Sequence, residues 1–260
     1  MRLSLALCLA LAACGTTYAV PGGPDATAPQ AGAAPASPPG RARTTGDYAR
    51  VLARVEPAAE RLCRQEQPDA PAAWCDYRIT LDRDPDAAPN AYQSEGDDGR
   101  PDVHFAATLL PLMTSDDEIA FVLSHEAGHH IAGHVPKQRQ QQALGALVGG
   151  LAAAVGNAYG IPMAQDEAMN VGASVGGRAY SQTYELEADT LGAFIAARAG
   201  YDPERGADFF GRPEIASAGG LPILVSHPGS AQREATVARA AAEIRRQRAQ
   251  GLEPTPDAAR

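Results

Sequence analysis

Aromatic residues, cysteine and positive charge are all scarce in this chain. Phe, Trp and Tyr make up 5% of its 260 residues. The chain has 22 Lys and Arg and 31 Asp and Glu, which gives a formal net charge of −9. This charge argues against a nucleic-acid partner, because a phosphate backbone is neutralised by Lys and Arg. With few aromatic residues and much alanine, we expect a lightly built, helix-rich core. The length suits one domain with tails, or at most two small domains.

Long apolar runs are also few, and the first is an export signal rather than part of the fold. Leu3–Ala13 follows a positively charged start and is too short to span a bilayer. It leads into Leu-Ala-Ala-Cys-Gly, which resembles a bacterial lipobox, in which the cysteine, here Cys14, is lipidated and becomes the first residue. The alternative is an ordinary secretory signal with an incidental cysteine. By resemblance to lipoprotein sorting rules, Gly15 favours the outer membrane.

We therefore expect a signal peptide over 1–13 and a lipid anchor that holds the protein on the periplasmic side of the cell envelope, at the outer membrane. A second apolar run, 143–161, is interrupted by glycines. Its length alone allows a membrane span, but it is short and broken, and the lipid anchor already serves that purpose. A core helix and a mobile flap near the active site are the other two interpretations of this run.

The four cysteines divide between the leader and the fold. Cys8 leaves with the signal peptide and Cys14 carries the lipid, so Cys63 and Cys75 remain in a compartment that permits disulfides. We expect these two to form a disulfide that ties the first helix to the first strand. Two free buried thiols are the alternative.

The remainder reads as a linker, a folded domain and a tail. Residues 14–44 are rich in Pro, Gly, Ala and Thr and predict a flexible tether. The folded domain is expected over 45–250, and 251–260 is expected to be a disordered tail. Helical spacing begins at Asp47, whereas alternating residues predict a strand over Tyr77–Leu81.

Two further short strands are expected at Asn90–Tyr92 and Val103–Phe105, with a polar, glycine-containing turn between them. These segments predict an α+β fold, mainly helical. In this fold a small antiparallel sheet packs on the active-site helices.

The chemistry lies on the next predicted helix, which opens with a capping box at Ser115 and Glu118. This helix carries His125-Glu126-Ala127-Gly128-His129, an H-E-x-x-H motif. Four residues turn a helix by about 400°, so the two imidazoles share a face and can bind one ion. Glu126 lies about 100° round the helix and can reach a water at the metal without ligating the metal.

A second helix, from about Tyr180 to Ala199, supplies the third ligand. It contains Glu-Leu-Glu-Ala-Asp, in which Glu185 and Asp189 share a helical face. A catalytic zinc needs three protein ligands and one open position, and two His with one Glu are a standard set. Asp189 can then accept the spare ring N–H of a ligand histidine. Glu187 competes for the ligand role, but it does not share the face of Asp189.

Three other histidines are expected away from the metal. His130 points about 100° from His129 and is expected to be exposed or to lie behind the ligands. The helix is expected to run to about His134 and to end before Pro136. If it is straight, the His134 side chain points about 140° away from that of His129. His104 lies on a strand candidate and is interpreted as an ordinary polar residue.

His227, which precedes Pro228, and Arg233 give a weaker signal. The simplest interpretation is a loop histidine and an arginine on a helix face. As chemistry, the two could donate hydrogen bonds to the oxyanion of a tetrahedral intermediate, an effect of about 3 kcal/mol per donor in other enzymes.

Together these motifs resemble the HtpX-like zinc endopeptidases, the gluzincin family that also contains the CAAX prenyl proteases and the mitochondrial Oma-type peptidases. The resemblance covers about residues 45–245. It implies zinc ligands at His125, His129 and Glu185, a base at Glu126, and transition-state contacts from His227 and Arg233. Two departures concern substrate binding rather than the metal: Gln182 stands where an arginine is usual, and Gln93–Asp102 is unusually acidic.

The sequence thus predicts a zinc metalloendopeptidase with one zinc ion per chain, which degrades misfolded or misassembled envelope proteins. Glu126 would take a proton from water and pass it to the leaving amine. An extended peptide would pair with an edge strand around Val103–Phe105. Two rivals stay open: a non-catalytic lipoprotein that binds unfolded proteins and holds a structural zinc with four protein ligands, and a zinc hydrolase of cell-wall peptides.

Overall fold

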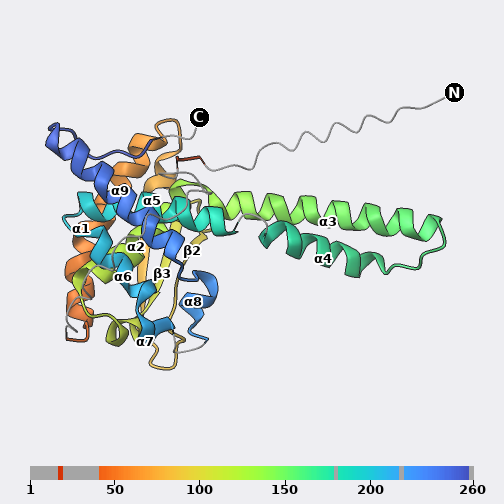
Figure 1. Ribbon diagram of the computed structural model, residues 1–260, viewed down its shortest axis with the longest axis horizontal. Helices are drawn as coiled ribbons and strands as arrows, with labels where there is room; N and C mark the ends of the chain where they lie inside the picture. The colour runs from red at the N-terminus through yellow and green to blue at the C-terminus, as the bar shows by residue number, and fades with distance from the viewer. Residues whose placement is uncertain (1–16, 20–40, 179–180, 217–219, 258–260) are drawn as a thin grey trace.

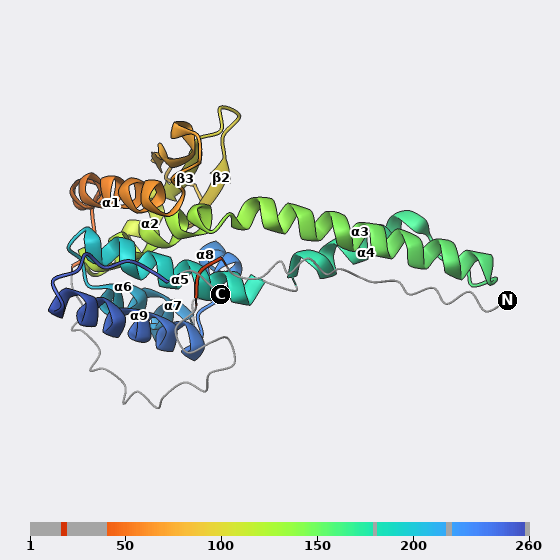
Figure 2. The same cartoon turned by 90° about the horizontal axis from the view of Figure 1, so that it is seen from above.

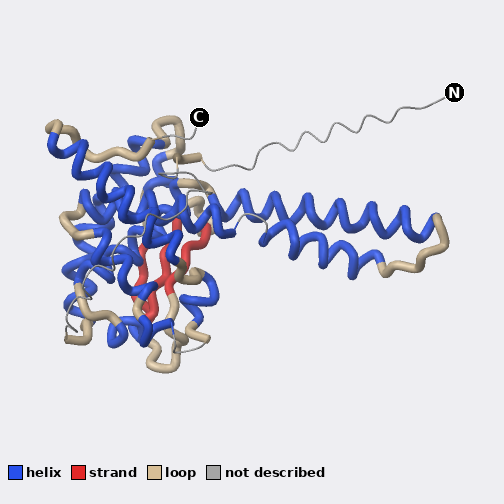
Figure 3. Tube along the Cα trace, in the orientation of Figure 1, coloured by secondary structure: helices blue, strands red, loops and turns tan. Residues whose placement is uncertain are grey.

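Helices form most of the folded chain. The computed structural model describes residues 17–19, 41–178, 181–216 and 220–257. A small sheet lies among the helices of a body, from which two long helices extend together (Figures 1 and 3). The expected α+β, mainly helical fold is confirmed. The helices in chain order are α1 (Thr45–Glu66), η1 (Ala72–Cys75), η2 (Ala107–Leu112), α2 (Asp116–Ile131), α3 (His134–Ala158), α4 (Gln165–Arg178), α5 (Ser181–Arg198), α6 (Pro203–Gly211), α7 (Pro213–Ala216), α8 (Pro222–Ser226) and α9 (Ala231–Ala249).

The central element of the body is α2. It packs between α1 and α5, and α9 covers the far side of α5 (Figure 2). All residues of Glu118–Gly128 are buried, so this part of α2 has no solvent-facing stripe. Its start follows the expected cap: the Ser115 hydroxyl accepts a hydrogen bond from the Glu118 N–H. The Glu118 carboxylate accepts from the Thr114 N–H at 2.7 Å, one residue earlier than in a standard capping box.

The sheet differs from the expected antiparallel one. Its strands are β1 (Arg78–Asp82), β2 (Ala91–Glu95) and β3 (Pro101–Ala106), in the order β1-β3-β2. β2 and β3 are antiparallel, but β1 and β3 are parallel, so the prediction was wrong for that pair. Because β3 is paired on both sides, its backbone groups are taken, and Val103–Phe105 is not the edge that was expected to receive a peptide. Among the described strands, the edges are β1 and β2.

α2 ends earlier than the sequence suggested. It stops at Ile131, and Gly133 adopts a left-handed conformation with φ of 65°, which only glycine takes up readily. A new helix, α3, begins at His134. Pro136 therefore does not end a helix but lies in the first turn of α3, where its missing N–H removes no hydrogen bond. The change of direction at Gly133 overturns the assumption of a straight helix through His134.

The apolar run 143–161 forms most of α3, which packs along α4 as a hairpin that projects from the body (Figure 1). The two helices approach through small residues: a Cβ added at Gly145 would lie 2.1 Å from the Gly172 carbonyl oxygen. Large apolar side chains face outward, with Leu147 and Leu151 exposed by 58% and 59%. The run is thus not a core helix. Among the residues that the structure describes, no helix is long and apolar enough to cross a bilayer.

A disulfide joins Cys63 in α1 to Cys75 in η1. It ties α1 to the segment that leads into β1, close to the expected position. Two residues after Cys75 lies Tyr77, whose hydroxyl donates to the Ala127 carbonyl on α2 at 3.0 Å. The disulfide therefore fixes the start of the sheet against the helix that carries the H-E-x-x-H motif.

Both terminal segments contribute to the packing. Within the predicted linker, Tyr18 is only 2% exposed and belongs to the core. In the tail that was predicted to be disordered, residues as far as Asp257 contact the body. The Arg198 Nε–H donates to the Pro254 carbonyl at 2.6 Å, and the Ala19 N–H donates to the Asp257 carbonyl at 2.8 Å. A short polar tail with a single large apolar residue, Leu252, carries no pattern that would reveal this packing.

Candidate metal centre

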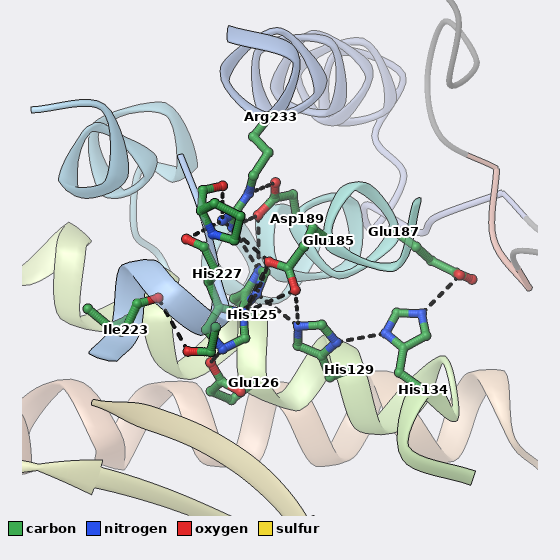
Figure 4. A network of polar contacts seen from close by, with 12 residues as sticks. His125, Glu126, His129, His134, Glu185, Glu187, Asp189, Ile223, His227 and Arg233 are labelled. Atoms are coloured by element: carbon green, nitrogen blue, oxygen red, sulfur yellow. Dashed lines mark hydrogen bonds and ion pairs between the residues drawn. The ribbon is translucent and has the colours of Figure 1, made fainter. Parts of the chain in front are cut away.

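Four side chains from three elements converge on one buried point. His125 and His129 lie on α2, Glu185 on α5, and His227 directly after α8, and their nearest nitrogen and oxygen atoms all lie within 4.8 Å of one another (Figure 4). The sequence predicted three of these donors as ligands. It assigned His227 to the oxyanion instead, and the structure places that ring among the donors.

The spacing of the donors suits a small cation. Ligands about 2.0 Å from a tetrahedral zinc are about 3.3 Å apart. The His125 Nε2 atom lies 2.9 Å from His129 Nε2, 3.2 Å from His227 Nδ1 and 3.3 Å from Glu185 Oε2. Imidazole nitrogens and a carboxylate oxygen are also the donor types that zinc prefers.

The electrostatics favour a positive charge at this point. Burial alone would lower the pKa of His125, but hydrogen bonds to Asp189 and Glu185 outweigh burial and raise that pKa to about 9. Burial opposes ionisation of Glu185, yet the imidazoles of His227, His125 and His129 hold its pKa well below the usual range. The residues therefore fit a divalent metal ion.

Close packing of α2 on α5 brings these donors together. A Cβ at Gly128 would lie 2.9 Å from the Ala188 carbonyl oxygen, and one at Gly192 would lie 3.1 Å from His125 Cα. Neither glycine leaves room for a side chain. The two helix backbones approach closely enough for side chains four residues apart on each helix to meet.

Asp189 lies where the sequence predicted it, behind His125. Its Oδ1 is 2.9 Å from His125 Nδ1, and it forms a two-bonded ion pair with Arg233 at 2.6 Å for each contact. Arg233 also approaches Glu185 Oε2 at 3.3 Å and is 5% exposed. Its guanidinium thus orients Asp189 and Glu185, so the structure gives Arg233 different partners from the predicted oxyanion.

Glu126 lies beside the donors without joining them. Its carboxylate is buried, and Oε1 is 3.4 Å from His227 Nε2. His227 therefore directs one ring nitrogen at the metal donors and the other at Glu126, which occupies the place of a base next to the site.

Two side chains that the sequence excluded also belong to this network. His134 Nδ1 lies 2.7 Å from His129 Nδ1, and His134 Nε2 lies 3.0 Å from Glu187 Oε2. The turn at Gly133 brings His134 back to His129. In the sequence, the glycine directly before His134 was the signal that could have indicated this break in the helix. Glu187 is fully buried but faces His134, not the metal donors.

The other predicted residues lie elsewhere. His130 is buried, not exposed: its Nε2 is 2.7 Å from the Trp74 carbonyl, on the side of α2 that faces η1. His104 stacks on Tyr92 in the sheet. Cys14 falls outside the residues that the structure describes.

Two helices that present His, His and Glu to one point, with a glutamate following the first histidine, define the gluzincin class of zinc metallopeptidases. Comparison with known proteins narrows the class. The model of Peptidase family M48 matches residues 50–241, and the chain belongs to that family. Members of this family use zinc, for which the buried donors provide one site.

Two characterised relatives support this assignment. The mitochondrial metalloendopeptidase OMA1 of Saccharomyces cerevisiae is 30% identical over 165 residues, which cover 60% of this chain and 45% of OMA1. The metalloprotease LoiP of Escherichia coli is 31% identical over 126 residues, 48% of this chain and 49% of LoiP. The chain matches about half the length of each relative.

Proposed function

We propose that this chain is a zinc-dependent endopeptidase of the bacterial cell envelope that degrades misfolded or misassembled proteins. The observation that carries the proposal is the convergence of His125, His129 and Glu185 on one point beside Glu126. Zinc in such a site supplies Lewis acidity, which lowers the pKa of water and polarises a peptide carbonyl. Glu126 takes the proton of the attacking water and returns it to the leaving amine.

An unfolded substrate can be bound at a sheet edge, and β2 is an edge strand among the described strands. Extended peptides bind by adding a strand to an exposed sheet edge. The Ile223 N–H of α8 donates to the Pro89 carbonyl at 3.4 Å, so the segment before β2 lies beside α8, which His227 directly follows. We infer that an extended peptide pairs with β2, in place of the β3 edge that the sequence suggested.

The test of catalysis is zinc content and casein cleavage for wild type and Glu126→Gln. The variant should bind one zinc per chain and lose cleavage by a factor of about 10² to 10⁴, the usual contribution of a general base. Cleavage at the wild-type rate would refute the role of Glu126.

One observation supports the alternative of a non-catalytic protein with a structural zinc, namely the fourth donor, His227. With His227 among the ligands no position remains for a substrate carbonyl, whereas the donors on α2 and α5 alone leave one open. His227→Ala separates the two functions. An enzyme whose zinc is held by three ligands keeps its metal in this variant, but a closed structural site loses affinity sharply and shows no cleavage in either form.

We further propose that Cys14 carries the lipid anchor, on the sequence pattern described above. Labelling with a radioactive fatty acid should mark the wild-type chain and not Cys14→Ser. Equal labelling of both, or recovery of both in the soluble periplasmic fraction, would refute the anchor.

A further inference from the structure

A chain of buried polar contacts runs from the metal donors to the N-terminal segment. It starts at the ring nitrogen of His129 that faces away from the other donors, passes through His134, and reaches Glu187 (Figure 4). The second oxygen of that carboxylate accepts the backbone N–H groups of Thr17 and Tyr18, at 2.5 and 2.7 Å. His134 and Glu187 are 4% and 0% exposed, so water does not substitute for these partners.

The partners at each end decide where the protons of this chain lie. A carboxylate only accepts hydrogen bonds, so His134 donates to Glu187 from Nε2. A neutral imidazole that donates from one nitrogen accepts at the other, so His134 Nδ1 accepts from His129 Nδ1–H. His129 then carries its lone pair on Nε2, the atom that lies 2.9 Å from His125 Nε2 among the metal donors.

The other ligand histidine, His125, is oriented by a similar but shorter chain of hydrogen bonds. His125 Nδ1 meets the carboxylate of Asp189 directly, and Arg233 holds that carboxylate in place. For His129 the carboxylate is one imidazole further away. The two backbone N–H groups of the N-terminal segment take the part that Arg233 plays for Asp189.

The N-terminal segment is built into this position. Tyr18 is buried in the core, the Ala19 N–H donates to the Asp257 carbonyl, and the Lys137 ammonium donates to the Thr17 hydroxyl at 2.7 Å. Without the segment, the fully buried Glu187 carboxylate would lose two hydrogen-bond donors, and a buried carboxylate that lacks its donors is unfavourable.

We propose that His134 and Glu187 are positioning residues that fix the proton on His129 Nδ1, and that docking of Thr17 and Tyr18 on Glu187 completes this arrangement. The inference rests on the proposed zinc site but not on catalysis. Thr17 lies three residues after Cys14, so the segment that follows the proposed lipid attachment site is also part of the support of the metal centre.

The decisive variant is Glu187→Gln, with zinc affinity measured by competition against a chromophoric chelator. A glutamine keeps the size and accepts from Thr17 and Tyr18, but its amide then faces His134 as a donor. This forces His134 to donate to His129 and places a proton on the metal-facing nitrogen. We expect zinc affinity to fall by about 10- to 100-fold, as for other groups that support a metal ligand.

A purely structural role predicts the opposite, since glutamine would then restore full affinity. Zinc affinity equal to wild type in Glu187→Gln would overturn the proposal. The ¹⁵N shifts of the His129 ring in the zinc-loaded protein give a second readout: they should report a proton on Nδ1 in wild type.

His134 offers a second test that leaves Glu187 in place. His134→Leu should weaken zinc binding, whereas His134→Gln should retain most of it, because one amide can accept from His129 and donate to Glu187. Equal zinc affinity in the two variants would contradict the proposed chain of hydrogen bonds.

The N-terminal segment is tested at Thr17, where proline removes the N–H and alanine keeps it. Thr17→Pro should weaken zinc binding in the same direction as Glu187→Gln but less, because Tyr18 still donates. Thr17→Ala loses only the hydroxyl that accepts from Lys137 and should bind zinc more tightly than Thr17→Pro. Equal affinities for Thr17→Pro and Thr17→Ala would overturn the part assigned to this segment. All measurements use the Glu126→Gln background, so they stand whether or not the protein cleaves casein.

Discussion

Two helix pairs of this molecule use the same packing device with different results. α2 and α5 approach through Gly128 and Gly192, and α3 and α4 approach through Gly145 and Gly172. In the first pair the outer faces are covered by α1, α6 and α9, and the shared face carries the metal donors. In the second pair the outer faces bear exposed leucines and valines, and residues 143–165 contain no charged side chain.

The comparison shows what close backbone approach does and does not determine. Small residues let two helices meet, but the surrounding elements decide whether the pair becomes an enclosed site or an exposed arm. We therefore expect the body and the hairpin to respond to matched substitutions in opposite ways.

The largest difference is expected for glycine replaced by valine. Gly128→Val would place Cβ 2.9 Å from the Ala188 carbonyl, force α5 away from α2, and separate Glu185 from the two histidines. Tight zinc binding and casein cleavage should both be lost. Gly145→Val meets a still closer contact, 2.1 Å from the Gly172 carbonyl, but should change only the hairpin. Loss of zinc in Gly145→Val would show that the hairpin is coupled to the site.

Leucine truncation is the next test. Leu191 in α5 is fully buried, so Leu191→Ala should lower the free energy of unfolding by about 2–5 kcal/mol. Leu147 in α3 is 58% exposed, and Leu147→Ala should change it by less than about 0.5 kcal/mol. Urea unfolding followed by the fluorescence of Trp74, the single tryptophan, reports on the body. Similar losses for both variants would mean that the outer face of α3 is covered in solution.

The disulfide gives a somewhat smaller effect, confined to the body. Cys63 and Cys75 are 12 residues apart, and closing a loop of this size stabilises a fold by about 3 kcal/mol. Replacing both by alanine should lower the urea midpoint of the Trp74 signal by a corresponding amount. The rate at which a protease cleaves the hairpin should not change, and a faster cleavage there would contradict the separation of the two regions.

Helix caps provide the smallest expected effect. α2 begins with the Ser115 side-chain cap, whereas α3 follows Gly133 without one. Ser115→Ala should cost about 1 kcal/mol of unfolding free energy, and Ser115→Asp should restore it, since aspartate also caps a helix. An unchanged urea midpoint for Ser115→Ala would indicate that tertiary packing alone fixes the start of α2.

The parts of the site that the sequence could predict depend on local geometry. His125 and His129 share a face because of helical periodicity, and the same argument pairs Glu185 with Asp189. Where tertiary contacts decide, the sequence was a poorer guide. The position of His227 among the donors depends on how α8 packs, and the parallel pairing of β1 with β3 depends on strand order.

His134 illustrates a different limit. In a straight helix the His134 ring would point away from His129, but Gly133 breaks the helix and brings the two rings into contact, so that prediction was wrong. Tyr18 is hidden in a stretch rich in Pro and Gly, where one aromatic residue carries no periodic signal. The contacts of such single residues can be found only from the three-dimensional structure.

The central claim is that side chains of α2 and α5 hold one zinc ion. The most direct measurement is an anomalous difference map, recorded at the zinc absorption edge from crystals of the zinc-loaded protein. We expect a single strong peak between His125, His129 and Glu185. A peak bound by other residues, or Glu185 turned away from the two imidazoles, would contradict it.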